Sequence, residues 1–144
     1  MISESTIHSV EISTIAHATE DPSKVEAVLR KLVADSNPQF TRRYLEGHHR
    51  NPIITFNAKL TDKTAAQFAR DFVKRLSRNS RLLIQRNLAL HSDDKGNLYI
   101  RVDKQKSVKG QIELGEDDPI RIKIKFNRLS GDLEQMITAF LELE

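Results

Sequence analysis

The chain has 144 residues, of which 23 are Lys or Arg and 20 are Asp or Glu, so its formal net charge is +3. This length predicts one domain over residues 1–144, since domains usually span roughly 100–200 residues. Cysteine is absent, which excludes disulfides, thiolate metal sites and cysteine nucleophiles. No apolar run reaches the roughly 18 residues of a membrane span, and the amino terminus lacks the pattern of a signal peptide. We therefore expect a cytoplasmic protein that does not bind membranes.

The charge is unevenly distributed along the chain. Residues 132–144 contain four acidic residues and no Lys or Arg, a net of -4, which leaves 23 − 16 = +7 on the rest of the chain. A basic body favours polyanionic partners such as nucleic acid. Ordinary solubilising charge is the alternative explanation.

The chain begins with a predicted strand and helix. β-branched residues on one parity over 7–17 indicate the strand. Asp21 is placed to cap a helix and Pro22 suits its first position. One apolar stripe supports this helix: Val25, Val28, Leu29 and Leu32.

Two further strands and a second helix follow. A short strand is expected at 41–46, and the turn 47–52 joins it to a strand at 53–60 with alternating apolar residues. Residues 61–79 then predict a helix whose buried side is formed by Ala65, Phe68, Phe72 and Leu76. Residues 80–91 fit either a strand or a short helix, and we favour the helix.

The last third of the chain alternates most clearly. Residues 98–105 and 120–126 read as strands, with a shorter strand at 111–114 between them. Ser130 is expected to cap a final helix. This order of half-polar strands and amphipathic helices predicts an α+β fold with two layers, in which helices pack on one face of a mostly antiparallel sheet.

The adjacent pair His48 and His49 raises the question of a metal centre. Neighbouring residues on a strand point to opposite faces, so both could bind one ion only from a loop. Zinc sites usually supply three or four ligands at recognisable spacing, and no such spacing is found. His91 beside Asp93 and Asp94 is equally typical of a turn. We therefore predict no metal and no cofactor.

Catalytic patterns are also missing. The sequence has no Gly-x-Ser-x-Gly elbow, and its five glycines are too scattered for a loop that cradles phosphate. Two carboxylates could still meet in space, but no spacing points to such a pair. We expect a protein that is not an enzyme.

The outward parity of the last two strands is basic. Its members are Tyr99, Arg101, Arg121, Lys123 and Lys125. If these strands share a sheet covered on one side by helices, these residues form a cationic face with one aromatic ring. Cations on such a face suit phosphate contacts, and the ring suits stacking on an unpaired base. Plain solvation of a half-exposed sheet is the alternative.

A second basic series lies on the second helix and near the histidine pair. Arg70, Lys74 and Arg78 recur every four residues and would line one edge of a helix, where like charges repel. A binding role would explain why such repulsion is present. The same surface is expected to extend to three arginines near the histidine pair: Arg42, Arg43 and Arg50.

Four ordered motifs carry a family resemblance, which spans about residues 8–126: "HATED", "EGHHRNPI", "GNLYIRVDKQ" and "DDPIRIKIKF". Together they resemble the archaeal family of predicted RNA-binding, exosome-associated subunits. The resemblance implies a compact α+β fold similar to that of the ribosomal protein that holds 5S rRNA. It also implies that RNA is contacted by His48, His49, Arg50, Arg101, Lys104 and Gln105. Arg50 departs from the pattern, in which a glycine would follow the histidines, and an arginine disfavours the positive φ of a tight turn there.

These observations lead to a non-catalytic RNA-binding protein, an accessory factor in exosome-associated RNA processing or in ribosome assembly. Structured RNA is the expected partner, with exosome or ribosome-assembly proteins as further partners and a homodimer as an open alternative. One competing hypothesis is an interaction subunit that docks an acidic protein. The other is a metal-dependent nuclease or phosphoesterase that uses His48 and His49.

Overall fold

The computed structural model describes residues 6–47, 51–127 and 133–142, and five strands within them form one sheet in the order β2-β3-β1-β5-β4. Every neighbouring pair is antiparallel. The strands are β1 (Ile7–Ala16), β2 (Thr41–Glu46), β3 (Pro52–Thr61), β4 (Asn97–Asp103) and β5 (Pro119–Phe126). Strand β1 lies at the centre, and β2 and β4 form the two edges.

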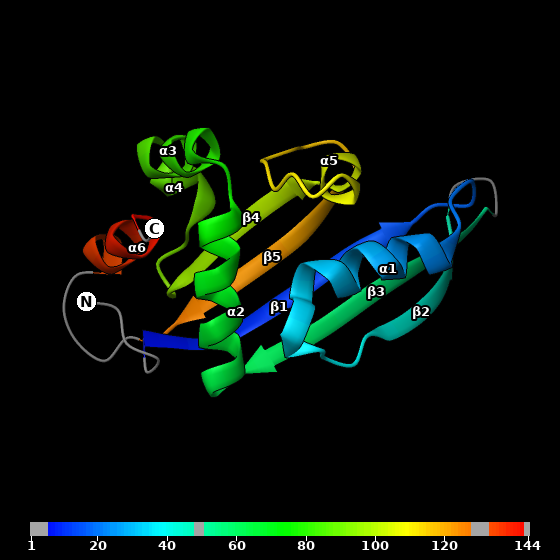
Figure 1. Ribbon diagram of the computed structural model, residues 1–144, viewed down its shortest axis with the longest axis horizontal. Coiled ribbons are helices and arrows are strands. Elements are labelled where there is room, and N and C mark those ends of the chain that lie inside the picture. Colours follow the sequence, from blue (N-terminus) through cyan, green and yellow to red (C-terminus); the bar gives the residue numbers. More distant parts are fainter. Residues whose placement is uncertain (1–5, 48–50, 128–132, 143–144) are drawn as a thin grey trace.

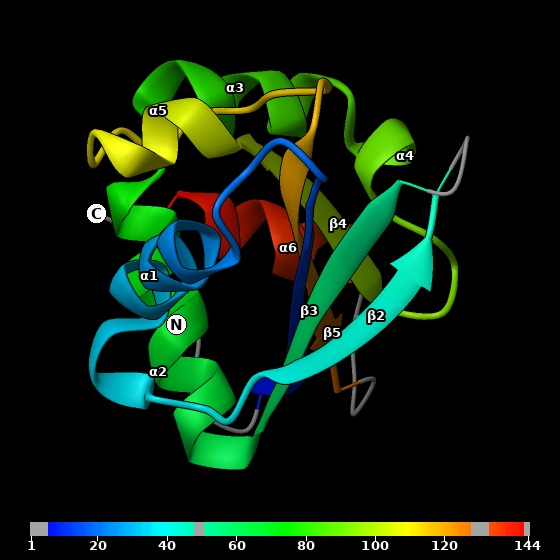
Figure 2. The same ribbon diagram turned by 90° about the vertical axis from the view of Figure 1, so that its right-hand side faces the viewer.

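Helices α1 and α2 cover one face of this sheet and leave the other face open (Figure 1, Figure 2). The helices are α1 (Pro22–Val33), the 3-10 turn η2 (Ala34–Ser36), α2 (Asp62–Arg75), α3 (Arg78–Arg86), α4 (Leu88–His91), α5 (Lys104–Val108) and α6 (Leu133–Leu141). The predicted α+β class, with two layers and an antiparallel sheet, is confirmed. None of the helices in the described ranges has the length and apolar character needed to cross a bilayer.

The core lies between the sheet and the helices because each strand turns one parity inward. Strand β5 buries Ile120, Ile122 and Ile124, as its alternation predicted. Helix α2 supplies Phe68 and Phe72, whose rings stack with centroids 5.6 Å apart. Such aromatic pairs add about 0.5–1.5 kcal/mol to the free energy gained by burial itself.

Local signals fixed the beginning of the first helix. The Asp21 side chain accepts a hydrogen bond from the Ser23 N–H at 2.9 Å, and Pro22 occupies the first turn of α1. The predicted helix at 80–91 is also present, divided into α3 and α4 near Asn87. The cap proposed at Ser130 lies outside the described residues.

Two predicted elements are wrong in extent. The helix expected over 61–79 ends at Arg75, because Leu76 is extended and bridges to Ile112, and the Ser77 side chain then caps a new helix. The expected strand at 111–114 is reduced to isolated bridges of Ile112 and Leu114. Arg70, Lys74 and Arg78 therefore do not share one helix edge, since Arg78 belongs to α3.

Candidate nucleic-acid interface

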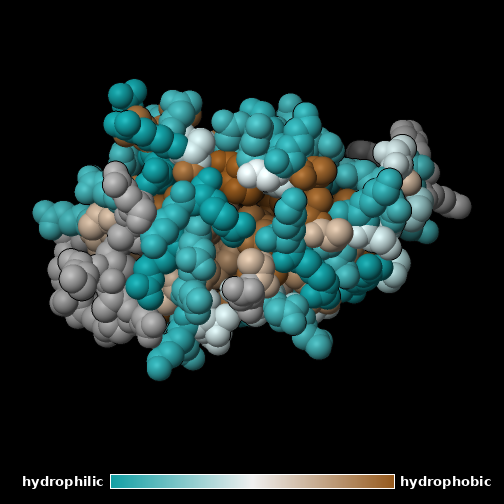
Figure 3. Space-filling model, in the orientation of Figure 1, coloured by the Kyte–Doolittle hydropathy of each residue, from teal (hydrophilic) through white to brown (hydrophobic). Residues whose placement is uncertain are grey.

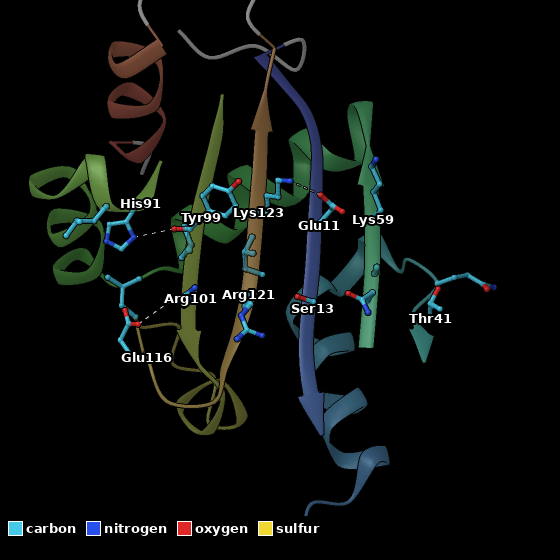
Figure 4. Close-up of a pocket in the computed structure, with 17 residues that line it drawn as sticks. Glu11, Ser13, Thr41, Lys59, His91, Tyr99, Arg101, Glu116, Arg121 and Lys123 are labelled. Carbon is cyan, nitrogen blue, oxygen red and sulfur yellow. Dashed lines mark hydrogen bonds and ion pairs between the residues drawn. The ribbon is translucent and has the colours of Figure 1, made fainter. Parts of the chain in front are cut away.

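The open face of the sheet is a hollow of about 670 Å³ whose floor is formed by the outward side chains of the strands (Figure 4). Strands β4 and β5 are neighbours, so the predicted residues Tyr99, Arg101, Arg121 and Lys123 meet there. Lys125 has the same parity on β5 and is exposed. The cationic face expected from the two alternating strands is therefore assembled.

One line of residues crosses the whole sheet, and we call it the arginine row. Its members are Arg101, Arg121, Ser13, Asn57 and Thr41, which are direct neighbours on successive strands. Like charges directly opposite each other on antiparallel strands are destabilising. The row thus begins with two adjacent arginines, continues with a serine, an asparagine and a threonine, and contains no carboxylate.

The negative charge near these two arginines is weak. Arg101 Nη1 lies 3.5 Å from Glu116 Oε2, and the Glu116 side chain is 81% exposed. Arg121 has no ion pair among the described residues. Exposed pairs of this kind contribute about 0–1 kcal/mol, so Glu116 offsets little of the positive charge at the start of the row.

A second line lies beside the arginine row, and we call it the tyrosine row: Tyr99, Lys123, Glu11 and Lys59 (Figure 4). Lys123 Nζ lies 5.9 Å from the centre of the Tyr99 ring and 3.6 Å from Glu11 Oε2. The ring itself is exposed. This row alternates in charge and presents the one aromatic ring that was expected on the face.

Asp93 holds this tyrosine in place. The Tyr99 hydroxyl donates to Asp93 Oδ2 at 2.9 Å, and the Asn97 amide and the backbone N–H groups of Lys95 and Asn97 also donate to this carboxylate. Desolvation raises the pKa of Asp93, but these hydrogen bonds outweigh it and hold the pKa well below its usual range. The hydrogen bond to Asp93 raises the pKa of Tyr99. Asp93, near His91, therefore stabilises the turn that follows it and fixes the position of the Tyr99 side chain.

The short helix α4 raises a rim along the β4 side of the hollow. Leu90 and His91 line this side, and His91 Nδ1 lies 3.3 Å from the Tyr99 carbonyl oxygen. Gln39 and Thr41 line the opposite side, next to edge strand β2. The face is therefore a trough with a basic floor.

Arg42 and Arg43 lie on opposite sides of β2, because neighbouring residues of a strand alternate. Arg43 shares the open face. Arg42 turns to the helix-covered side, where its guanidinium pairs with Glu26 at 3.0 Å and lies over the Phe56 ring. The expectation that both arginines extend one surface is wrong for Arg42. The histidine pair and Arg50, at 48–50, lie outside the described residues.

The predicted cations on the second helix lie away from the trough. Arg70 and Lys74 belong to α2, which covers the opposite face, and Arg78 belongs to α3. Gln105 is exposed on α5, also on the helix-covered side. These residues form no common site with the two rows.

Lys104 is buried, although the resemblance implied that it faces RNA. Its Nζ donates to the Ile15 carbonyl at 2.7 Å and lies 3.0 Å from Glu20 Oε1 and 2.7 Å from Asp118 Oδ2. His17 Nε2 contacts the same Asp118 at 2.9 Å. Desolvation raises the pKa of Asp118, but hydrogen bonds from Lys104 and His17 outweigh it and lower the pKa. Because all three ammonium donors have partners inside the protein, we leave Lys104 out of the proposed surface.

The same group contains ligand types that metals use. In the described part of the chain, His17, Glu20 and Asp118 bring ligand atoms within 4.8 Å of one another. The Lys104 ammonium already pairs with both carboxylates and offsets one of their two negative charges. A cation there would have to displace it, so this arrangement fits an ion-pair network better than a metal site.

The helix-covered side has a different character (Figure 3). Hydrophobic side chains gather between α1 and α5 and are surrounded by hydrophilic ones. A groove of about 500 Å³ there is lined by Val25, Val28 and Val108 together with Lys24 and Lys31. Its apolar floor is less suited to phosphate than the floor of the trough.

Sequence reasoning missed several residues of the trough, namely Ser13, Thr41, Asn57 and Lys59. Their outward parity was visible in the alternation of their strands. Strand order was not visible, and only that order places them in line with Arg121 and Lys123.

Comparison with known proteins agrees with a nucleic-acid interface. A family model described as RNA binding matches residues 9–126. The chain belongs to this RNA-binding family. RNA-binding protein PAB1135 of Pyrococcus abyssi is 30% identical over 141 residues, covering 94% of this chain and 92% of that protein.

Solved structures of similar archaeal proteins share the fold. Protein SSO0741 of Sulfolobus solfataricus superposes with a TM-score of 0.79 at 26% identity, covering 92% of this chain and 96% of that one. Mth689, a DUF54 protein of Methanothermobacter thermautotrophicus, gives a TM-score of 0.77 at 27% identity, covering 95% and 99%.

Proposed function

We propose that this protein binds RNA through the open face of its sheet and has no catalytic activity of its own. The observation that carries the proposal is the cross-strand pair of Arg101 and Arg121. Two arginines directly opposite each other on neighbouring strands, with one weakly placed carboxylate, cost the fold stability. A phosphate bound between them would relieve this repulsion and accept charge-assisted hydrogen bonds from both.

The remainder of the arginine row supports RNA rather than DNA as the ligand. Ser13, Asn57 and Thr41 offer neutral donors and acceptors in line with the arginines. The ribose 2′-hydroxyl both donates and accepts hydrogen bonds, so such groups distinguish RNA from DNA. The Tyr99 ring beside the row suits stacking on an unpaired base.

The biological role we propose is that of an accessory factor in RNA processing, associated with the exosome or with ribosome assembly. Its support is the resemblance of the four sequence motifs to predicted exosome-associated subunits. Structured RNA is the ligand we propose, because a trough with a basic floor and a rim along α4 suits an unpaired segment presented by a folded RNA.

The test is binding of three fluorescently labelled ligands at several salt concentrations: a stem-loop RNA, an unstructured RNA of equal length and duplex DNA. We expect tight binding of the stem-loop, with affinity that falls steeply as salt rises because counterions are released. The double variant Arg101→Gln/Arg121→Gln should lower the slope of log affinity against log salt by about 1 to 2. It should melt no lower than the unmodified protein, since the repulsion is removed.

A matched control removes two exposed cations from the helix-covered side: Lys24→Gln/Lys63→Gln. It changes net charge equally, so an equal loss of affinity would reject the open face as the site. Equal weak binding of all three ligands would reject RNA binding. Co-purification with a protein complex that survives nuclease treatment would then favour an acidic protein partner.

A further inference from the structure

Edge strand β2 is exposed along its entire length. All six of its residues are exposed, and Tyr44 reaches 70%. The strand pairs only with β3, in an unbroken register, and Figure 2 shows it along the outer margin of the sheet. It contains no proline, lysine or bulge, which are among the devices that protect a sheet edge from pairing. Its charged residues, Arg42, Arg43 and Glu46, include both signs, so they repel a second strand only in some registers.

The pairing with β3 determines which backbone groups of β2 remain available. Antiparallel ladders alternate between hydrogen-bonded and non-hydrogen-bonded pairs. The Gly47 N–H donates to the Asn51 carbonyl at 2.7 Å, so this pair is hydrogen-bonded and the next pair, Glu46 with Pro52, is not. Proline has no N–H, which agrees with this assignment.

The same alternation continues down the strand. The N–H and C=O groups of Leu45 and Arg43 point to β3, and those of Glu46, Tyr44 and Arg42 point to the free edge. Three residues of β2 thus present backbone donors and acceptors where no further strand follows.

These three residues are complementary to the same three residues of a second copy of the chain. When a second β2 runs antiparallel with Tyr44 opposite Tyr44, Arg42 of each copy faces Glu46 of the other. Each of the three facing pairs would exchange two backbone hydrogen bonds, about six in total. Both Arg–Glu pairs and the aromatic pair are favourable cross-strand combinations.

Neighbouring registers lack this complementarity. Moving the two-fold axis by one residue places either Arg43 opposite Arg43 or Leu45 opposite Leu45. The first brings like charges together, and both shifts remove the two pairs between Arg42 and Glu46. Arg42 can donate hydrogen bonds to Glu26 and to Glu46 of the second copy at the same time, because a guanidinium has five N–H donors.

We propose that the protein forms a homodimer in which β2 pairs with β2 of a second copy across a two-fold axis at Tyr44. The axis is perpendicular to the sheet, so helix layers lie on one side and open faces on the other. The two sheets become one continuous sheet. This inference does not depend on RNA binding and is tested without RNA.

The register is tested by single cysteines, since the chain has no native cysteine. At the hydrogen-bonded pair on the axis the two Cα atoms lie roughly 5.5 Å apart, within the range of about 4.4–6.8 Å that a disulfide requires. The Cβ atoms of such a pair lie roughly 5.5 Å apart, more than the about 3.5–4.5 Å of a relaxed disulfide, so Tyr44→Cys is tested with a short bifunctional thiol reagent and should cross-link rapidly between two copies. In this register, position 43 of one copy faces position 45 of the other. A cysteine placed at only one of these positions, Arg43→Cys or Leu45→Cys, therefore has no cysteine opposite it and should cross-link much more slowly.

Sedimentation over a concentration series tests the dimer itself. Tyr44→Pro removes an N–H that faces the edge and leaves the hydrogen bonds to β3 intact. We expect the unmodified protein to be dimeric and this variant to associate at least about tenfold more weakly. A melting curve checks that the variant is folded.

Three results would overturn the proposal. One is an unmodified protein that remains monomeric throughout the series. Another is a folded Tyr44→Pro variant that dimerises as well as the unmodified protein, which would place the interface elsewhere. The third is cross-linking at Arg43→Cys or Leu45→Cys that equals or exceeds that at Tyr44→Cys.

Discussion

Replacing Lys104 by methionine tests whether this lysine supports the fold or contacts RNA. The Lys104 side chain is 3% exposed, and the partners of its ammonium are the Ile15 carbonyl at 2.7 Å, Glu20 at 3.0 Å and Asp118 at 2.7 Å. Methionine has an unbranched side chain of similar length, so it fills most of the space of the lysine side chain and opens no large cavity. The change therefore removes the charge and leaves the two carboxylates facing each other.

The expected cost follows from the exposure of these partners. Removing one member of a buried ion pair typically costs about 3–5 kcal/mol. Here the Glu20 and Asp118 side chains are 21% and 37% exposed, so water reaches them and we expect about 2–3 kcal/mol. With an unfolding entropy of about 2.1 cal/mol/K per residue, the melting temperature should fall by roughly 7–10 °C.

Thermal and urea unfolding measure this change, with Lys106→Met as the matched control. Lys106 pairs with Glu113 at 3.1 Å, but these side chains are 49% and 37% exposed, so its loss should cost about 0–1 kcal/mol. RNA affinity should be equal in both variants. A stable Lys104→Met protein that no longer binds RNA would refute the structural role assigned to this lysine.

Two further variants test local features. Because the pKa of Asp93 is lower in the folded chain than its value of 3.8 in the unfolded chain, its contribution is complete above about pH 5 and is lost as the pH falls through the folded-state pKa. Asp93→Asn should therefore lower the free energy of unfolding in urea by more at pH 7 than at pH 2, where part of this contribution is already lost; an equal loss at both pH values would contradict this. A Cβ on Gly115 would lie 2.8 Å from the Asp103 Cα, so Gly115→Ala should cost about 1–3 kcal/mol, and an unchanged melting temperature would show that the backbone yields there.

The elements that sequence predicted best are those with one buried face. Strand β5 alternates without a break from Ile120 to Phe126, since every second side chain lies in the core. Helix α1 was predicted to its first residue because Asp21 and Pro22 are local signals. Such patterns depend only on neighbours in sequence.

Predictions failed where long-range contacts decide the structure. Helix α2 ends because Leu76 joins Ile112 in a bridge, a contact that local propensity does not encode. A strand at 41–46 already implied that Arg42 and Arg43 point apart, but all six residues of β2 are exposed, so no apolar parity showed which arginine faces the helices. The strand predicted at 98–105 extended two residues too far, because the Asp103 side chain caps α5 and ends β4 there.

Three of the four motifs that carried the family resemblance meet in the Lys104 network. "HATED" supplies His17 and Glu20, "GNLYIRVDKQ" supplies Lys104, and "DDPIRIKIKF" supplies Asp118. This network joins the ends of β1, β4 and β5. Several residues of these motifs therefore stabilise the sheet. The order of the strands, rather than the motifs, shows which residues share the proposed RNA-binding face.

The proposed dimer and the proposed RNA surface together make one more prediction. With the two-fold axis perpendicular to the sheet, the open faces lie side by side and Arg43 of each copy lies near the junction. A long RNA would then cross cations of both copies, whereas a short RNA would fit on one trough.

Tyr44→Pro separates these contributions because it prevents pairing without changing net charge. We expect it to bind a short stem-loop as tightly as the unmodified protein does. With the stem-loop extended at both ends, the unmodified protein should bind more tightly and with a steeper salt dependence than the variant, because it neutralises more phosphates per complex. Equal slopes on the long RNA would mean that contact is confined to one copy, and the joined faces would then have no role in binding.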